Sequence, residues 1–143
     1  MQSEPDLTIM LNGGSVCPIR AEDFDGADFK IHMEGGETFK RAVIEFSNSI
    51  DRVLEKANKK LSDVNFFVPH QANLRIIQAV AKRIGLPIEK VSVTLNKFGN
   101  SSSTSIGLAL NDALDNNKIK EGDLVLFTAF GGGFTWGSTL MIW

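Results

Sequence analysis

The sequence predicts an α/β fold: a mixed, mostly parallel sheet of about five strands, with helices on both faces and an antiparallel hairpin at the C-terminal end. Two observations predict it. Short apolar runs alternate along the chain with longer segments whose apolar residues recur every three or four positions, which is typical of strand–helix–strand units. The last two apolar runs, Leu124–Phe130 and Phe134–Ile142, are joined by three glycines, which favours a hairpin.

The first third of the chain is expected to hold two short strands and a long helix. A strand over Leu7–Leu11 is followed by a turn at 12–14 and an acidic loop at 20–28. Phe29–Met33 alternates apolar and polar residues, as a half-buried strand does. A helix is expected over Glu37–Lys59, because its apolar residues form a single stripe.

The middle of the chain predicts a second strand–helix–strand unit. The apolar run Asn65–Val68 reads as a strand that ends at Pro69, since proline cannot donate to a strand ladder. A helix is expected over Asn73–Ile84, with Gly85 as its C-terminal cap. Val91–Leu95 then predicts another short strand.

The helix expected over Ser102–Asn116 contains many small residues, among them Ser105 and Gly107. Small residues let a helix approach a neighbour closely, and glycine costs about 1 kcal/mol relative to alanine inside a helix. We therefore expect this helix to be buried in a crowded layer, against another helix. The alternative is an ordinary amphipathic helix with a polar start.

Composition narrows the class of protein. Of the 143 residues, 43% are hydrophobic and 22% are charged, which is ordinary for a single globular domain over 1–143. The net charge of −2 gives no overall basic character for binding nucleic acid. The single cysteine excludes an internal disulfide, and no ligand pattern suggests a metal. The chain shows neither a signal peptide nor a membrane span, so a soluble, cytoplasmic protein is expected.

Three loops each follow an expected strand, which is where open α/β sheets bind their ligands. His70 can donate a hydrogen bond or move a proton, or it can be structural. Asn100 is either a helix cap or a donor to developing negative charge. Gly131–Gly133 is either a plain turn or a source of bare backbone amides. Cys17 is interpreted as incidental, and the mid-strand His32 is given no role.

Three strings then resemble a known family, in matching order and spacing: VPHQANLRIIQAVAKRIGLP, VTLNKFGNSSSTSIGLALNDAL and FTAFGGGFTWGSTLMIW. They resemble the C-terminal half of 3-oxoacyl-[acyl-carrier-protein] synthase III, a condensing enzyme of the thiolase fold. The resemblance is clear over 29–143 and loose over 1–28. A polyketide-type or hydroxymethylglutaryl-CoA synthase fits less well. The resemblance implies one half of a duplicated fold, whose helix over 102–116 would meet the missing half or a second copy in a homodimer.

The resemblance also implies a reaction. The family joins acetyl-CoA to malonyl-acyl carrier protein (ACP), with loss of CO2, through a Cys-His-Asn triad. The motifs place its histidine at His70 and its asparagine at Asn100. The cysteine lies in the other half, so this chain is expected to be inactive alone. Gly132 would supply an oxyanion-hole amide, and Phe130 would lie near the acyl pocket.

The substrates implied by the family are CoA and phosphopantetheine thioesters, with no covalent cofactor. Many relatives carry asparagine where this chain has Gly36, which leaves one substrate contact open. The alternative function is a non-catalytic module that binds such thioesters, or an inactive fragment. A basic helix face is expected to dock the acidic carrier protein, unless it is merely solvated. The positions implied for the substrate tunnel are Gly36, Phe39, Ala72 and Asn73, and those for carrier docking are Arg75, Lys82, Arg83, Lys40 and Arg41.

Overall fold

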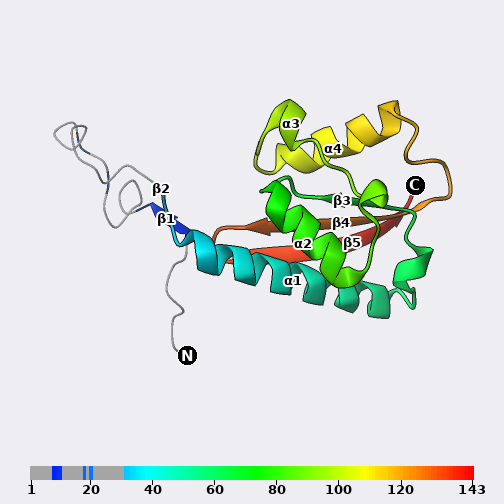
Figure 1. Cartoon of the computed structure of the whole chain (residues 1–143), viewed down its shortest axis with the longest axis horizontal. Coiled ribbons are helices and arrows are strands. Elements are labelled where there is room, and N and C mark those ends of the chain that lie inside the picture. The colour runs from blue at the N-terminus through cyan, green and yellow to red at the C-terminus, as the bar shows by residue number, and fades with distance from the viewer. Residues whose placement is uncertain (1–7, 11–17, 19, 21–30) are drawn as a thin grey trace.

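The computed structural model describes residues 8–10, 18, 20 and 31–143 (Figure 1). The predicted turn at 12–14, the acidic loop at 20–28 and Cys17 lie outside the described residues, except for position 20. Within the described part, no helix is both long enough and apolar enough to cross a bilayer. The cytoplasmic location stays a prediction.

The central sheet is mixed and has three strands in the order β3-β4-β5. Strand β3 (Phe66–Pro69) runs parallel to β4 (Leu124–Gly131), and β4 is antiparallel to β5 (Thr135–Ile142). The predicted C-terminal hairpin is therefore confirmed, with Gly131 opposite Thr135 at its closed end.

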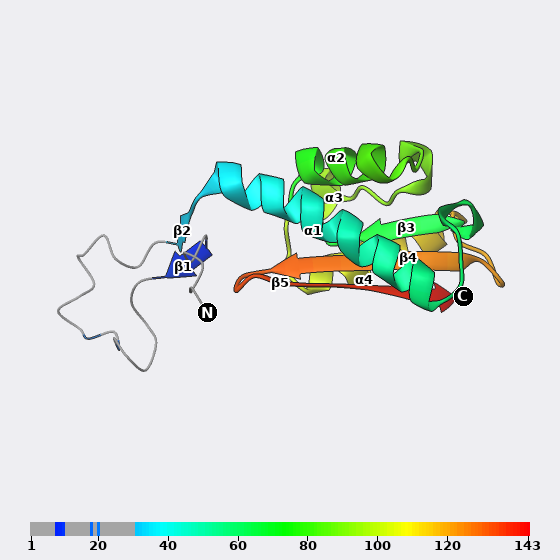
Figure 2. The same ribbon diagram turned by 90° about the horizontal axis from the view of Figure 1, so that it is seen from below.

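Helices cover both faces of this sheet, as predicted (Figures 1 and 2). Helix α1 (Gly35–Lys56) and helix α2 (Leu74–Ile84) pack on one face, and helix α4 (Thr104–Asp115) lies on the other. The strand pleat separates two clusters, because successive side chains point to opposite faces. Phe67 and Leu126 belong to the cluster of α1 and α2. The cluster under α4 consists of Phe66, Val68, Val125 and Ile119 with Ala109 and Ala113.

The ends of α2 follow from its sequence. The Asn73 side chain accepts a hydrogen bond from the backbone N–H of Arg75 at 2.8 Å and so caps the helix. Gly85 adopts the left-handed conformation, with φ of 79°, which confirms it as the C-terminal cap. Helix α1 starts two residues before the predicted Glu37 and ends at Lys56.

The prediction of about five strands in one mostly parallel sheet is wrong for the described part of the chain. The two N-terminal strands form as β1 (Thr8–Met10) and β2 (Ile31–Met33), but they pair only with each other, in an antiparallel ribbon. The ribbon lies beside the start of α1 (Figure 1). The expected strand over 91–95 is reduced to a single parallel bridge between Val91 and Phe67.

A buried side chain explains the lost strand. The backbone N–H of Ser92 still donates to the Phe67 carbonyl at 2.8 Å, as in a ladder. Two residues later, the backbone N–H of Thr94 donates to the Gln71 side chain instead, at 2.8 Å. The chain then turns into the short helix α3 (Leu95–Phe98). Two 3₁₀ turns, Leu61–Asp63 and Ile88–Lys90, complete the described elements.

Helix α4 packs on the sheet through Ser105, Ala109 and Ala113, which are buried. Among the described residues α4 packs chiefly on β3, and it meets the short helix α3 through an ion pair between Lys97 and Asp112. Close packing of α4 against a further helix stays a prediction. Its larger apolar residues are only half-buried: Ile106, Leu108, Leu110 and Leu114.

Candidate active site

The carboxyl ends of β3 and β4 and the amino-terminal ends of α1, α2 and α4 meet at one edge of the sheet (Figure 1). A cavity of about 680 Å³ opens there, which we call the main cavity. It is the position where open α/β sheets bind ligands. Its lining includes ten of the predicted site residues: His70, Asn100, Gly132, Phe130, Gly36, Phe39, Ala72, Asn73, Arg75 and Lys40.

His70 follows the last residue of β3 and is held by two elements. Its backbone N–H donates to the Thr128 carbonyl at 2.8 Å, which extends the pairing with β4. The residue is 9% exposed, and its Nδ1 lies 2.6 Å from the Ser105 hydroxyl of α4. Burial lowers the pKa of His70 below its ordinary value of 6.5, and the nearby Ser102 backbone carbonyl opposes part of that shift. The ring is therefore neutral near pH 7.

Asn100 lies in the loop before α4 and faces the His70 loop. Its Oδ1 accepts from the Ser102 backbone N–H at 3.1 Å, and its Nδ2 reaches the Ala72 carbonyl at 3.4 Å. The cap position of α4 is Ser103, so the simple capping interpretation of Asn100 is wrong. The side chain is exposed, and its amide keeps a hydrogen for a further acceptor.

The turn between β4 and β5 requires glycine at position 133 but not at position 132. Gly133 has φ of +128°, a conformation that side chains rarely adopt. Gly132 has no φ in that region, and a Cβ added to it would meet nothing within 4 Å. The turn explains Gly133 but not Gly132, whose bare backbone lines the main cavity. This favours the bare-amide interpretation at Gly132.

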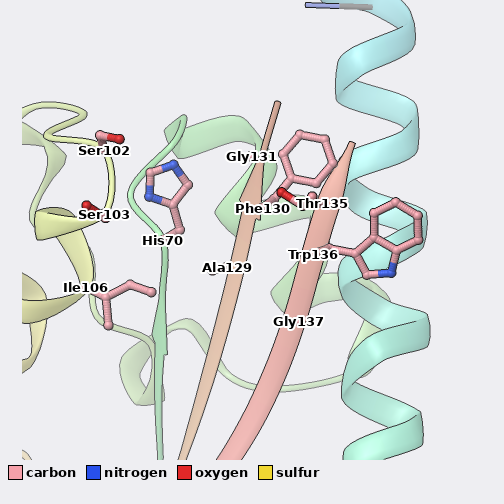
Figure 3. Close-up of a pocket in the computed structure, with 10 residues that line it drawn as sticks. All are labelled: His70, Ser102, Ser103, Ile106, Ala129, Phe130, Gly131, Thr135, Trp136 and Gly137. Atoms are coloured by element: carbon pink, nitrogen blue, oxygen red, sulfur yellow. The ribbon is translucent and has the colours of Figure 1, made fainter. Parts of the chain in front are cut away.

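Phe130 forms the wall between two cavities. Its ring packs edge-on against Phe46, with centroids 5.8 Å apart, and tilts over Phe134 at 4.6 Å. On its other side is a small cavity of about 320 Å³, which Figure 3 shows between the start of α4 and the β4–β5 hairpin. His70 lines both cavities, and Trp136 lines the small one.

The predicted basic residues divide into two groups. The guanidinium of Arg75 lies 5.5 Å from the Phe39 ring centroid at the main cavity, and Lys40 bonds to Glu37 at 2.6 Å. The others are absent from the described lining of that cavity. Lys82 and Arg83 are exposed in the last turn of α2, roughly 11 Å along the helix from Arg75, and Arg41 is half-buried on α1.

Sequence reasoning missed two buried residues that hold the site together. Gln71 is fully buried, and its Nε2 donates to the carbonyls of Pro69 at 2.9 Å and Ser92 at 3.1 Å. Ser105 contacts the His70 ring and also accepts from the Gln71 backbone N–H at 3.1 Å. The position of Gln71 directly after His70 in the sequence is the feature that could have identified it. Ser105 gave no signal beyond its small size.

The arrangement suits one kind of chemistry. A neutral imidazole, a carboxamide and an exposed glycine amide border one partly enclosed cavity, and each can donate to an oxygen that becomes negative. None of the three is a nucleophile. No cluster of three or more potential metal ligands occurs in the described ranges.

Comparison with known proteins decides the family. A family model described as the C terminal of 3-oxoacyl-[acyl-carrier-protein (ACP)] synthase III matches residues 54–143. The chain belongs to the 3-oxoacyl-[acyl-carrier-protein] synthase III family. It corresponds to the C-terminal domain of these thiolase-fold condensing enzymes of fatty-acid initiation.

Relatives named beta-ketoacyl-[acyl-carrier-protein] synthase III show the extent of the match. The Porphyromonas gingivalis protein is 44% identical over 96% of this chain, and the Aliarcobacter butzleri protein is 47% identical over 94%. The chain spans only 41% and 40% of their lengths. The crystal structure of the Thermus thermophilus synthase III has a TM-score of 0.82 and 41% identity, over 96% of this chain and 41% of that one. The Pseudomonas aeruginosa structure has a TM-score of 0.84 and 34% identity, with the same coverage.

Proposed function

We propose that this chain supplies the C-terminal side of a synthase III active site, which condenses acetyl-CoA with malonyl-ACP and releases CO2. One observation carries the proposal. His70, Asn100 and Gly132 come from three separate loops and line the same cavity. In this assignment, His70 and Asn100 are the histidine and asparagine of a Cys-His-Asn triad.

The chemistry follows from where charge develops. Loss of CO2 from the malonyl thioester leaves an electron pair that delocalises onto the thioester oxygen as an enolate. The enolate carbon then attacks the acetyl group on the missing cysteine, and the cysteine thiolate leaves. His70 and Asn100 donate to the enolate oxygen, and one such donor is typically worth about 3 kcal/mol of barrier. A neutral His70 suits this role, because its N–H can hydrogen-bond to the enolate oxygen without transferring the proton to it.

The acetyl carbonyl needs a separate oxyanion hole. We assign one of its donors to the backbone N–H of Gly132, and we place the acyl chain beside Phe130. Support comes from the open space around Gly132, where neither sterics nor backbone conformation requires a glycine. The second donor would be the amide of the missing cysteine.

The main cavity is the proposed path for the thioester arm. Gly36, Phe39, Ala72 and Asn73 all line it, as a channel for phosphopantetheine or CoA requires. These thioesters are the substrates, and no covalent cofactor is proposed. Oδ1 of Asn73 already caps α2, which leaves its Nδ2 to meet the arm.

The carrier protein is proposed to dock on the basic side of this opening. Arg75 and Lys40 lie at the main cavity, and Lys82, Arg83 and Arg41 extend the positive surface along α2 and α1. An acidic partner would be steered to this surface. The alternative, a merely solvated helix face, applies most directly to Lys82 and Arg83, which are exposed and far from the cavity.

The N-terminal half that bears the cysteine is the proposed partner for the exposed apolar surface of α4 and β5. Met141 of β5, which lies opposite Val125 of the α4 cluster, is 39% exposed. Ile106 of α4 and Phe127 of β4 line a further hollow of about 480 Å³ between these elements. Surfaces of this kind mark interaction sites. A second copy of this chain is the other candidate for covering it.

Reconstitution tests the proposal. The chain is mixed with the N-terminal remainder of the Aliarcobacter butzleri relative, and condensation of acetyl-CoA with malonyl-ACP is assayed. We expect no turnover from either part alone, and turnover from the mixture that disappears with His70→Ala. A folded complex without turnover would contradict the proposal. If the chain alone then bound CoA, the non-catalytic binding module would be the better description.

A further inference from the structure

The Ser105 hydroxyl occupies an unusual place for a residue with no assigned role. It is 1% exposed, and it lies between the His70 ring and the backbone of the next residue. Its Oγ is 2.6 Å from Nδ1 of His70 and 3.1 Å from the backbone nitrogen of Gln71. Those are its only hydrogen-bond partners in the described part of the chain.

The hydrogens available to these two bonds fix the direction of one and favour a direction for the other. A backbone N–H can only donate, so Gln71 occupies one lone pair of the Ser105 oxygen. The hydroxyl has a single hydrogen of its own, and leaving it unpaired inside the protein is costly. Nδ1 of His70 is the remaining partner, which favours the direction in which the hydroxyl donates to Nδ1.

We propose that Ser105 is a positioning residue that donates to Nδ1 of His70 and thereby holds the neutral ring in the tautomer with its hydrogen on Nε2. Burial of the ring keeps it neutral near pH 7. An accepted hydrogen bond at one ring nitrogen places the proton on the other. Nε2–H is then the ring's donor, which is the form that a developing oxyanion needs.

The other tautomer of the His70 ring has a definite hydrogen-bond partner. The backbone carbonyl of Ser102 acts on the same ring and favours a ring nitrogen that carries hydrogen. If Nδ1 donated to that carbonyl, the Ser105 hydrogen would lose its acceptor, and Nε2 would present a lone pair. The tautomer itself concerns this chain alone, whereas its consequence for catalysis rests on the proposed function.

Nitrogen NMR of the ring tests the tautomer directly. The chain is labelled with ¹⁵N, and a long-range ¹H–¹⁵N spectrum is recorded at about pH 8, where histidine is neutral. The sequence has 2 histidines, and His32→Gln assigns their signals. We expect Nδ1 of His70 to resonate as an unprotonated acceptor and Nε2 as a protonated nitrogen. A protonated Nδ1 would overturn the proposal.

Substitutions then test Ser105 as the cause. Ser105→Ala is expected to remove the bias, so that both ring nitrogens move toward averaged values, while Ser105→Cys keeps part of it. The matched control is Ser103→Ala, because Ser103 lines the small cavity together with His70 but has no hydrogen bond to the ring among the described residues. An unchanged tautomer in a folded Ser105→Ala protein would overturn the role of Ser105. If that variant does not fold, the wild-type spectrum and Ser105→Cys still decide.

In the reconstituted pair, Ser105→Ala should lower kcat about 10-fold and leave KM unchanged. A loss of about 10-fold is at the lower end of the range seen when a residue that orients a functional histidine is replaced. Lack of turnover in the unmodified pair would count against the proposed function, but it would not alter the ring spectrum of the chain. The two failures are therefore distinguishable.

Discussion

Replacement of Gln71 by leucine should destabilise the chain sharply, although it adds a hydrophobic residue to a buried site. Gln71 is 0% exposed and hydrogen-bonds three backbone groups. Leucine fills much of the same volume but leaves all three groups unpaired: the carbonyls of Pro69 and Ser92 and the N–H of Thr94. At about 1 kcal/mol for each bond, the expected loss is ~3 kcal/mol.

The measurement is urea unfolding of the chain, followed by far-UV circular dichroism, with the free energy of unfolding obtained by linear extrapolation. Gln78→Leu is the matched control, because Gln78 is exposed on α2 and should change stability by less than about 0.5 kcal/mol. A loss below about 1 kcal/mol for Gln71→Leu would refute the reasoning. It would mean that other contacts hold the segment around Thr94 beside β3.

Three further predictions concern single residues of the site. Burial lowers the pKa of His70, so the unfolded state binds more protons than the folded state near pH 6. The contribution of a neutral His70 to the free energy of unfolding is complete above about pH 6.5 and is lost as the pH falls through the folded-state pKa. His70→Gln should therefore flatten the acid side of a curve of stability against pH. A slope unchanged by His70→Gln would place the responsible group elsewhere. Gly133→Ala should cost about 1–3 kcal/mol in urea unfolding, because φ is +128° there, whereas Gly132→Ala should be nearly neutral for stability; equal losses would contradict the distinction. Arg75→Glu should slow association of carrier protein with the reconstituted pair more than Lys82→Glu does, measured by stopped-flow at low salt, because Arg75 lies at the main cavity. A larger effect at Lys82 would move the docking surface along α2.

Local signals in the sequence predict much of the fold. Helix α2 follows from its apolar stripe and from Gly85, whose left-handed conformation is a local property of a helix end. The C-terminal hairpin follows from two apolar runs separated by glycines. The location of the candidate site also follows, since loops after parallel strands meet at one sheet edge.

The remaining features depend on contacts between distant residues. The strand predicted over 91–95 fails because the Gln71 side chain, 23 residues earlier, takes the N–H of Thr94. The two N-terminal strands have suitable patterns, but no local rule states that they pair with each other and not with the central sheet. The contact between His70 and Ser105 joins residues 35 positions apart, and a serine near the start of a helix gives no hint of it.

The resemblance to the synthase III family supplied what the isolated residues left open. Asn100 alone fits a helix cap, yet Ser103 occupies that position and Asn100 lies across from the His70 loop. Glycines in a hairpin turn are usually explained by the turn itself, yet neither the backbone conformation nor crowding requires a glycine at position 132. In both cases the simpler interpretation fails on geometry that appears only once the chain is folded.

The most direct test of the proposed site is the turnover of the reconstituted pair with His70 and Asn100 replaced singly and together. If both side chains donate to one thioester oxygen, His70→Ala and Asn100→Ala should each lower kcat about 100- to 1,000-fold. The double variant should lose less than the product of the two, because groups that act as a unit are not additive. Near-normal kcat in either single variant, or losses that multiply fully, would contradict the convergence of these two groups on one oxygen.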